Sequence, residues 1–102
     1  NDTPDSAPLQ VLQRAGLRDV AEHPRFQADA ARPGTYGSGT KSGKIDYILL
    51  SPKLFEHVQD GGIFRKGVWA GTHGTIFEHY PEITNAGQAG SDHAALWTEL
   101  DV

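Results

Sequence analysis

Two short stretches of the chain carry apolar side chains on both faces of a predicted strand. Residues 44–50 (KIDYILL) and 94–98 (AALWT) are rich in aliphatic, β-branched and aromatic residues and lie next to loop-forming residues. Successive side chains of a strand point to opposite faces, so each strand would be apolar on either side of its sheet. The sequence predicts one clear helix, which can cover a single face. Something outside this chain is therefore expected to cover the other face.

Capping residues bound that helix, which is predicted over residues 7–15. Ser6 or Asp5 can accept hydrogen bonds from the free amides of the first turn, and Pro8 is tolerated that early in a helix. Gly16 suits the left-handed position that ends many helices.

Loops and short strands are predicted for the rest of the chain. Residues 18–43 are rich in Gly, Pro, Ser and Thr and lack periodicity, which indicates a long surface connection. A helical turn at 51–58 and a strand at 61–71, twisted at its two leading glycines, precede a second loop and the last strand. This order predicts an α/β (α+β) fold with one small, mostly antiparallel sheet and a helix layer on one face.

Composition narrows the classes of protein. With 102 residues the chain is one domain or less, and its formal net charge of −4 argues against a broad basic face for nucleic acid, although a small phosphate site remains open. The sequence has no apolar run long enough to span a membrane, and without Cys it has no disulfide or thiolate metal site. Because it also lacks Met, Asn1 is not expected to be a translation start, and the chain is expected to be a piece of something longer.

Three polar residues are placed unusually in the predicted strands. Asp46 shares a face with Ile48 and Leu50, where an unpaired carboxylate costs several kcal/mol, so it is expected to have a partner. Asp92 and His93 lie side by side where a loop of small residues meets the last strand.

These residues permit several interpretations. Ser91, Asp92 and His93 are unlike a hydrolase triad, because adjacent residues on extended backbone point in opposite directions. A zinc cluster is disfavoured against scattered surface histidines, because no ligand-like spacing joins the five histidines. Taken alone, Asp92 and His93 favour a loop-ending Asp and a half-buried, satisfied His. The histidines are His23, His57, His73, His79 and His93.

Three segments in order, NDTPDSAPLQ, KIDYILLSP and GSDHAALW, resemble the last three motifs of the endonuclease/exonuclease/phosphatase family, the deoxyribonuclease I-like phosphodiesterases. These motifs are a Gly-Asp-x-Asn strand end, an Asp before aliphatic residues, and a Ser-Asp-His before a strand. The family's usual Pro two residues after the His is Ala95 here. The matched residues are Asn1 followed by Asp2, then Asp46, then Ser91, Asp92 and His93.

The resemblance implies a four-layer αββα sandwich in which residues 1–102 form a partial domain, the C-terminal half. The main metal-binding Glu, the motif Asp and a second active-site His would belong to the missing half. The chain would then be part of a divalent-metal-dependent phosphodiesterase or phosphatase, inactive alone. The alternative is a non-catalytic binding or scaffolding module with an idle site.

The family's chemistry implies a role for each matched residue. His93 would be the base that activates water, because imidazole ionises near neutral pH. Asp92 would help to bind or orient Mg²⁺ or Mn²⁺, which favour oxygen ligands, or would hold an imidazole. Asp46 would orient the water or pair with the missing His, and Asn1 would donate its amide to the phosphate.

The substrate lies beyond what the motifs specify, and nucleic acid and phospholipid or inositol headgroups are all possible phosphoesters. Tyr36 and Lys41 are candidate substrate contacts from the glycine-rich loop. Solvation is the favoured alternative for the loop cations, which are Lys41, Lys44, Arg65 and Lys66. The open sheet face also predicts that the isolated chain self-associates.

Overall fold

The computed structural model describes residues 1–37 and 39–102. Over these residues the fold is mixed α/β, compatible with the predicted α+β class, and its strands form two small sheets instead of one. The helices are α1 (Ala7–Arg14) and α2 (Pro52–Phe55), with 3-10 turns η1 (Val20–Glu22) and η2 (Ala86–Gln88). The strands are β1 (Arg18–Asp19), β2 (Phe26–Gln27), β3 (Leu49–Leu50), β4 (Val58–Phe64) and β5 (Ala95–Leu100).

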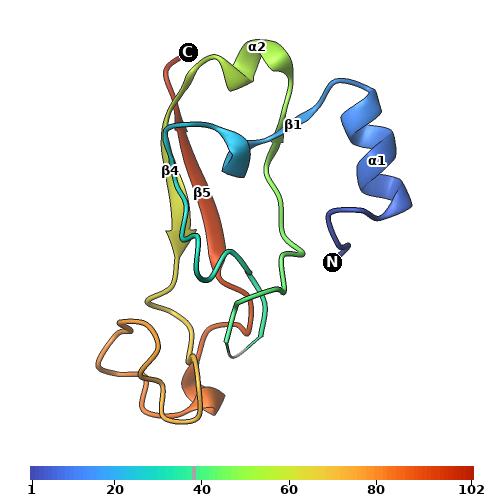
Figure 1. Ribbon diagram of the computed structural model, residues 1–102. Helices are drawn as coiled ribbons and strands as arrows, with labels where there is room; N and C mark the ends of the chain where they lie inside the picture. The colour runs from blue at the N-terminus through green and yellow to red at the C-terminus, as the bar shows by residue number, and fades with distance from the viewer. Residues whose placement is uncertain (38) are drawn as a thin grey trace.

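The larger sheet has the order β2-β4-β5, and the smaller one pairs β1 with β3. β4 and β5 are antiparallel, whereas the short β2 runs parallel to β4. Figure 1 shows β4 and β5 side by side, α1 set apart from them, and the loops that follow β4 gathered at the opposite end from α2. No helix of residues 1–37 and 39–102 has the length and apolar character needed to cross a bilayer.

The predicted helix forms, but one predicted cap does not. Ser6 is the N-cap residue, yet its side chain makes no capping bond, and its buried Oγ has no hydrogen-bond partner among the described residues. Pro8 occupies the second helical position and has no amide hydrogen, which removes one of the two donors that an N-cap hydroxyl commonly uses. At the other end Gly16 has a φ of 98°, the left-handed conformation that the sequence predicts.

The predicted strand over residues 44–50 is wrong for most of its length. Only Leu49 and Leu50 pair with a neighbouring strand, and residues 44–48 lie outside any sheet. The strand predicted at 61–71 begins earlier and ends at Phe64, and the last strand extends to Leu100. Ser42 and Thr35, both in the preceding loop, accept the amide hydrogens of residues 44–46, so apolar alternation alone overestimates the sheet.

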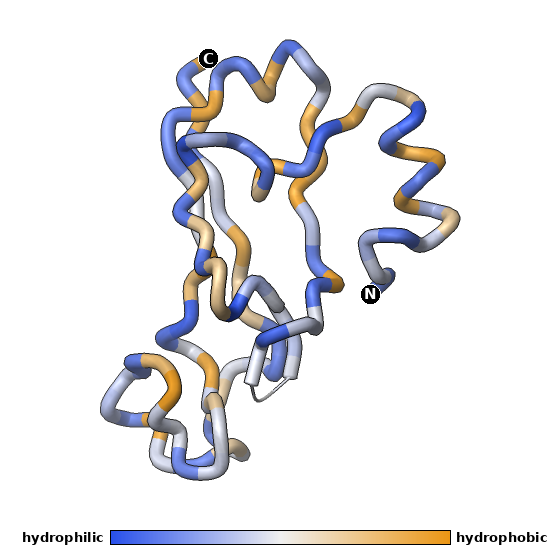
Figure 2. The backbone as a smooth tube through the Cα atoms, in the orientation of Figure 1, coloured by the Kyte–Doolittle hydropathy of each residue, from blue (hydrophilic) through white to orange (hydrophobic). Residues whose placement is uncertain are grey.

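The core lies on one face of the larger sheet. Its buried residues come from η1, β2, β3, α2 and β4, and Ile63, Leu96 and Leu100 pack against them. Figure 2 shows apolar segments along β5 and in the stretch that includes β3. The buried members are Val20, Phe26, Leu50, Phe55 and Val58.

Two adjacent glycines in β4 let aromatic rings lie against the sheet. A Cβ on Gly61 would come within 2.9 Å of the Phe26 ring, and a Cβ on Gly62 would come within 3.1 Å of the Trp97 indole nitrogen. Since neighbouring residues of a strand point to opposite faces, one ring lies on the core side and the other on the outer side.

The outer face of β4 and β5 is open. Phe64 and Trp97 are exposed there, and Tyr80 lies near Phe64 with 6.1 Å between the ring centroids. In the register of the two strands Ala95 is opposite Phe64 and Trp97 is opposite Gly62. Within the described residues this face thus has an exposed apolar area around Phe64, Ala95 and Trp97, and the charged Glu99 lies on the same face of β5.

Candidate active site

The structure brings Asp46 and His93 into direct contact. His93 Nδ1 lies 2.8 Å from Asp46 Oδ2 and 3.0 Å from Asp46 Oδ1, although the residues are 47 positions apart in the chain. Their side chains are 32% and 28% exposed, so the pair is open to solvent. Among the described residues the partner of Asp46 is His93, whereas the resemblance implies that Asp46 orients the water or pairs with a histidine of the missing half.

This contact defines the state of the imidazole. A carboxylate at Nδ1 favours the tautomer with hydrogen on Nδ1, which leaves the lone pair of Nε2 free to accept a proton. Asp92 Oδ1 lies 3.9 Å from Nε2, and the Asp92 side chain is largely exposed. Asp92 and Asp46 therefore approach opposite nitrogens of the same ring.

Ser91 has a local structural role. Its hydroxyl oxygen accepts a hydrogen bond from the backbone amide of His93 at 3.0 Å, which closes the turn into β5. No hydrogen bond joins Ser91 to the imidazole nitrogens in the described part of the chain. This geometry agrees with the prediction that Ser91, Asp92 and His93 do not form a hydrolase triad.

Tyr36 lies beside the pair on the glycine-rich loop. Its ring centroid is 5.0 Å from that of His93, and the two residues also pair as an isolated antiparallel bridge. The Tyr36 side chain is partly exposed, so one part contacts His93 and another part is available to a ligand.

Two other predicted residues lie outside this cluster. Asn1 and Lys41 are exposed, and within residues 1–37 and 39–102 neither forms a hydrogen bond or ion pair with Asp46 or His93. The segment beginning at Asn1 is nevertheless tied to the strand region, because the Tyr47 hydroxyl lies 2.8 Å from the backbone oxygen of Asp2.

Thr35 is a residue that the sequence analysis missed. It is 1% exposed, and its hydroxyl accepts hydrogen bonds from the amides of Ile45 and Asp46, both at 3.2 Å. Its backbone oxygen accepts from the amide of Ala94 at 2.7 Å. One residue of the loop therefore contacts both segments that carry the pair. A threonine in a Gly-rich and Ser-rich loop gave no sequence signal for this role.

A groove of about 160 Å³ lies beside His93. It is mostly apolar, and small residues form much of its wall. Such a groove places a ligand next to the imidazole. Its lining residues are Phe64, Gly67, Val68, Gly90, Ser91, His93 and Ala95.

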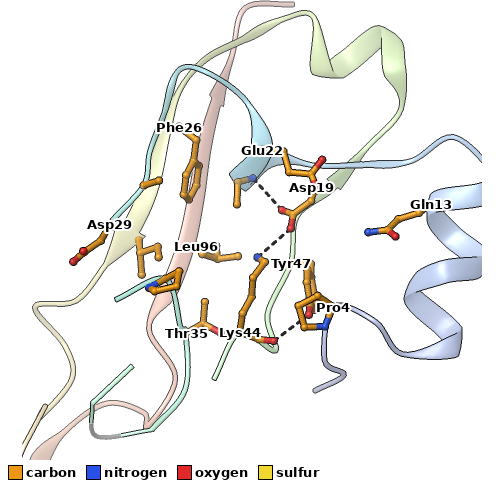
Figure 3. Close-up of a pocket in the computed structure, with 14 residues that line it drawn as sticks. Pro4, Gln13, Asp19, Glu22, Phe26, Asp29, Thr35, Lys44, Tyr47 and Leu96 are labelled. Atoms are coloured by element: carbon orange, nitrogen blue, oxygen red, sulfur yellow. Dashed lines mark hydrogen bonds and ion pairs between the residues drawn. The ribbon is translucent and has the colours of Figure 1, made fainter. Parts of the chain in front are cut away.

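A larger hollow of about 340 Å³ lies on the core side of the sheet, with residues of α1 and its leading segment among its walls. Figure 3 shows the ion pair at its edge, in which Lys44 Nζ lies 3.1 Å from Asp19 Oδ2. Asp19 also accepts a hydrogen bond from the amide of Ala21 at 2.9 Å, and Lys44 lies over the Tyr47 ring at 4.4 Å. Lys44, a candidate phosphate contact, is thus engaged within the fold.

Other loop cations are also engaged. Arg65 donates to the backbone oxygens of Gly34 and Arg32 and stacks on Phe77 at 4.2 Å. Burial lowers the pKa of the Arg65 guanidinium, which still stays protonated at physiological pH. Lys66 lies 3.8 Å from Glu78 in an exposed pair. Solvation, the alternative favoured by the sequence, therefore describes neither Lys44 nor Arg65.

The cluster can orient an imidazole and expose its free nitrogen, which is the arrangement of a general base. Over the described residues, no three His, Cys, Asp or Glu side chains converge as a metal site. Asp92 supplies a single exposed carboxylate beside Nε2.

Comparisons with protein-family models, with curated proteins and with solved structures gave no match.

Proposed function

We propose that residues 1–102 are the C-terminal half of a divalent-metal-dependent phosphoester hydrolase of the endonuclease/exonuclease/phosphatase type. The observation that carries the proposal is the contact between Asp46 and His93, which joins two of the three motifs at the entrance to β5. A carboxylate that orients an imidazole is what the activation of water requires, and the other nitrogen of His93 is free for it.

Each group of the cluster has a defined part in this chemistry. His93 Nε2 accepts the proton of the attacking water, and the Asp46 carboxylate stabilises the imidazolium that forms. Asp92 is a hard oxygen donor and would help to hold Mg²⁺ or Mn²⁺, with further ligands from outside this chain. When bound, the ion neutralises charge that grows on the phosphate. Asn1 would donate its side-chain amide to a phosphoryl oxygen once the missing half fixes its position.

The open sheet face supports the proposal of a half-domain. Phe64 and Trp97 would pack against the sheet of the N-terminal half, which completes the four-layer αββα sandwich. The chain alone is expected to cover this face by self-association at tens of micromolar, measured by analytical ultracentrifugation. Trp97→Lys should restore the monomer, whereas Lys53→Glu on α2 should not. A wild-type chain that sediments only as a monomer would count against this part of the proposal.

The substrate class is a phosphoester, either nucleic acid or a phospholipid or inositol headgroup. Tyr36 is placed to stack on it beside His93, and Lys41 is an exposed cation on the same loop. Lys44 and Arg65 already bind partners within the fold, so they contribute little charge for binding the phosphates of a long nucleic acid.

Hydrolysis of a chromogenic phosphodiester and of plasmid DNA, with Mg²⁺ or Mn²⁺, tests the proposal. The full-length protein should cleave at least one substrate, and the isolated chain should be inert. His93→Ala and Asp46→Ala should each reduce kcat by at least about 100-fold, because a general base typically contributes 10²–10⁴-fold. His57→Ala, which removes an exposed histidine, is the matched control. Full activity in His93→Ala would contradict the proposal, and an inert full-length protein would favour the non-catalytic module.

A further inference from the structure

We infer that Thr35 is a positioning residue that sets the geometry between Asp46 and His93. The inference rests on the proposed function for its catalytic meaning, but its structural content stands on the hydrogen bonds of Thr35 alone. Thr35 touches neither the free imidazole nitrogen nor a reacting atom, so it acts through the two residues that it holds.

The Thr35 side chain holds the segment that carries Asp46. Residues 44–48 lie outside any sheet, yet buried backbone amides require partners. The Thr35 hydroxyl accepts from the amides of Ile45 and Asp46, and it lies 3.3 Å from the backbone oxygen of Gly43 as a donor. A hydroxyl offers one donor and two acceptor lone pairs, so these three bonds use its full capacity. It replaces the neighbouring strand that this segment lacks.

The Thr35 backbone holds the segment that carries His93 and leads into β5. The backbone oxygen of Thr35 accepts from the amide of Ala94, and the next residue, Tyr36, forms the bridge with His93. Asp46 and the residue after His93 are therefore both fixed to Thr35, one through the side chain and the other through the backbone. Catalytic groups must keep their mutual geometry within roughly 0.5 Å, which a shared anchor provides.

Close packing makes this anchor specific. Thr35 is almost fully buried, and a Cβ on Gly34 would lie 2.7 Å from the Thr40 oxygen and 2.8 Å from the Gly43 nitrogen. The loop therefore folds tightly around Thr35, and position 34 has no room for a side chain. Figure 3 shows Thr35 beside Lys44, at the start of the segment that leads to Asp46.

Thr35→Val tests the inference, because valine keeps the shape and removes the hydroxyl. The readout is the ¹⁵N chemical shifts of the His93 ring in the 102-residue chain, which report where the imidazole carries its hydrogen. Wild type should hold a single tautomer with hydrogen on Nδ1. Thr35→Val should give a mixture, as Asp46→Ala should, and Thr35→Ser should keep the wild-type spectrum. Thr40→Val is the matched control, since Thr40 is also buried but donates to Gly39.

The same variants in the full-length protein separate positioning from overall stability. A misplacement on the order of 1 Å costs up to about 100-fold, so Thr35→Val should lower kcat by 10-fold or more with little change in KM. A folded Thr35→Val chain with an unchanged His93 spectrum would overturn the inference. If the full-length protein is inert, the proposed function fails, while the tautomer experiment still decides the role of Thr35.

A second measurement covers the case in which Thr35→Val does not fold. Amide hydrogen exchange of the wild-type chain should show Ile45 and Asp46 protected, although no strand pairs with them. Exchange of both amides at the rate of an unstructured peptide would overturn the inference without any variant.

Discussion

Lys44 and Asp46 stand two residues apart on one extended segment, yet their polar pairs have different surroundings. Lys44 pairs with Asp19, whose side chain is 6% exposed at the edge of the larger hollow. Asp46 pairs with His93, and about 30% of each of these side chains is exposed. The first pair is largely enclosed by the fold, whereas the second is open to solvent. The structural pair and the pair to which we assign a chemical role therefore differ first in their exposure.

The partners of the two carboxylates, Asp19 and Asp46, differ in the same way. Asp19 accepts from Lys44 and from the amide of Ala21, and both partners lie within the fold. Asp46 directs both oxygens at one nitrogen of His93 and leaves the other nitrogen free. A buried charge that loses its partner is strongly destabilising, whereas an exposed one is rehydrated.

Lys44→Met should give the largest loss of stability. It leaves Asp19 buried with one amide as its remaining partner, and we expect a cost of about 3 kcal/mol in the free energy of unfolding, measured by urea denaturation at neutral pH. Lys53→Met, in the exposed part of α2, should change it by less than about 0.5 kcal/mol. The double variant Asp19→Asn with Lys44→Met should regain part of the loss. An unchanged urea midpoint in Lys44→Met would show that the pair of Lys44 and Asp19 does not stabilise the fold.

Asp46→Ala should change the His93 imidazole more than it changes the stability of the fold. Its cost in unfolding free energy should stay within about 1 kcal/mol, because the pair is solvent-exposed, while the preference of the His93 tautomer is lost. Urea denaturation and ¹⁵N spectra of the imidazole measure the two effects on the same sample. A cost as large as that of Lys44→Met would mean that both pairs are structural.

Tyr47 lies under Lys44 and gives the fold a dependence on alkaline pH. Burial raises the pKa of Tyr47, and the negative charge of Asp19 adds to this effect. In the unfolded chain the phenol ionises at about pH 10, whereas the folded chain keeps its proton to higher pH. The stability due to this group is therefore present below about pH 10 and is lost as pH rises above it.

Tyr47→Phe should remove that alkaline loss. At neutral pH it should cost less than about 1 kcal/mol through the hydrogen bond to Asp2. Thermal unfolding at a series of pH values from neutral to alkaline checks both effects, with Tyr80→Phe as the control. An alkaline limb identical to that of wild type would show that Tyr47 is not its source.

The smallest expected effect concerns Asp60, a carboxylate that takes no part in either pair. The side-chain amide of Gln27 and then the backbone amide of Gly61 lower its pKa through hydrogen bonds. Gln27→Ala should therefore raise the pKa of Asp60 towards its ordinary value, measured by NMR titration, without a measurable change in stability. Gln10→Ala on α1 should leave the Asp60 titration unchanged. A shift of the same size in both variants would point to a general charge effect instead of this contact.

Local chemistry explains which parts of this fold were predictable. Gly16 and the apolar run of β5 carry strong local signals, and the structure has both. Asp46 was expected to need a partner because it would lie on a buried strand face, but its segment forms no strand at that point and its side chain is 32% exposed. The identity of the partner did not follow from the sequence, because His93 lies 47 positions away and a loop brings the two together. Thr35 was beyond prediction for the same reason: its role depends on amides ten or more residues ahead, which no sequence period marks.

The adjacent glycines of β4 also constrain how this sequence can change over time. Phe26 occupies the space of a side chain at position 61, and Trp97 occupies the space of one at position 62, on opposite faces of the strand. A larger residue at position 62 requires a smaller ring at position 97, whereas a Cβ at position 61 would also lie 3.0 Å from the backbone oxygen of Trp97. Across descendants of this chain, positions 62 and 97 should therefore vary together. Position 61 should stay glycine even where the ring at position 26 changes, because the obstacle there is partly backbone.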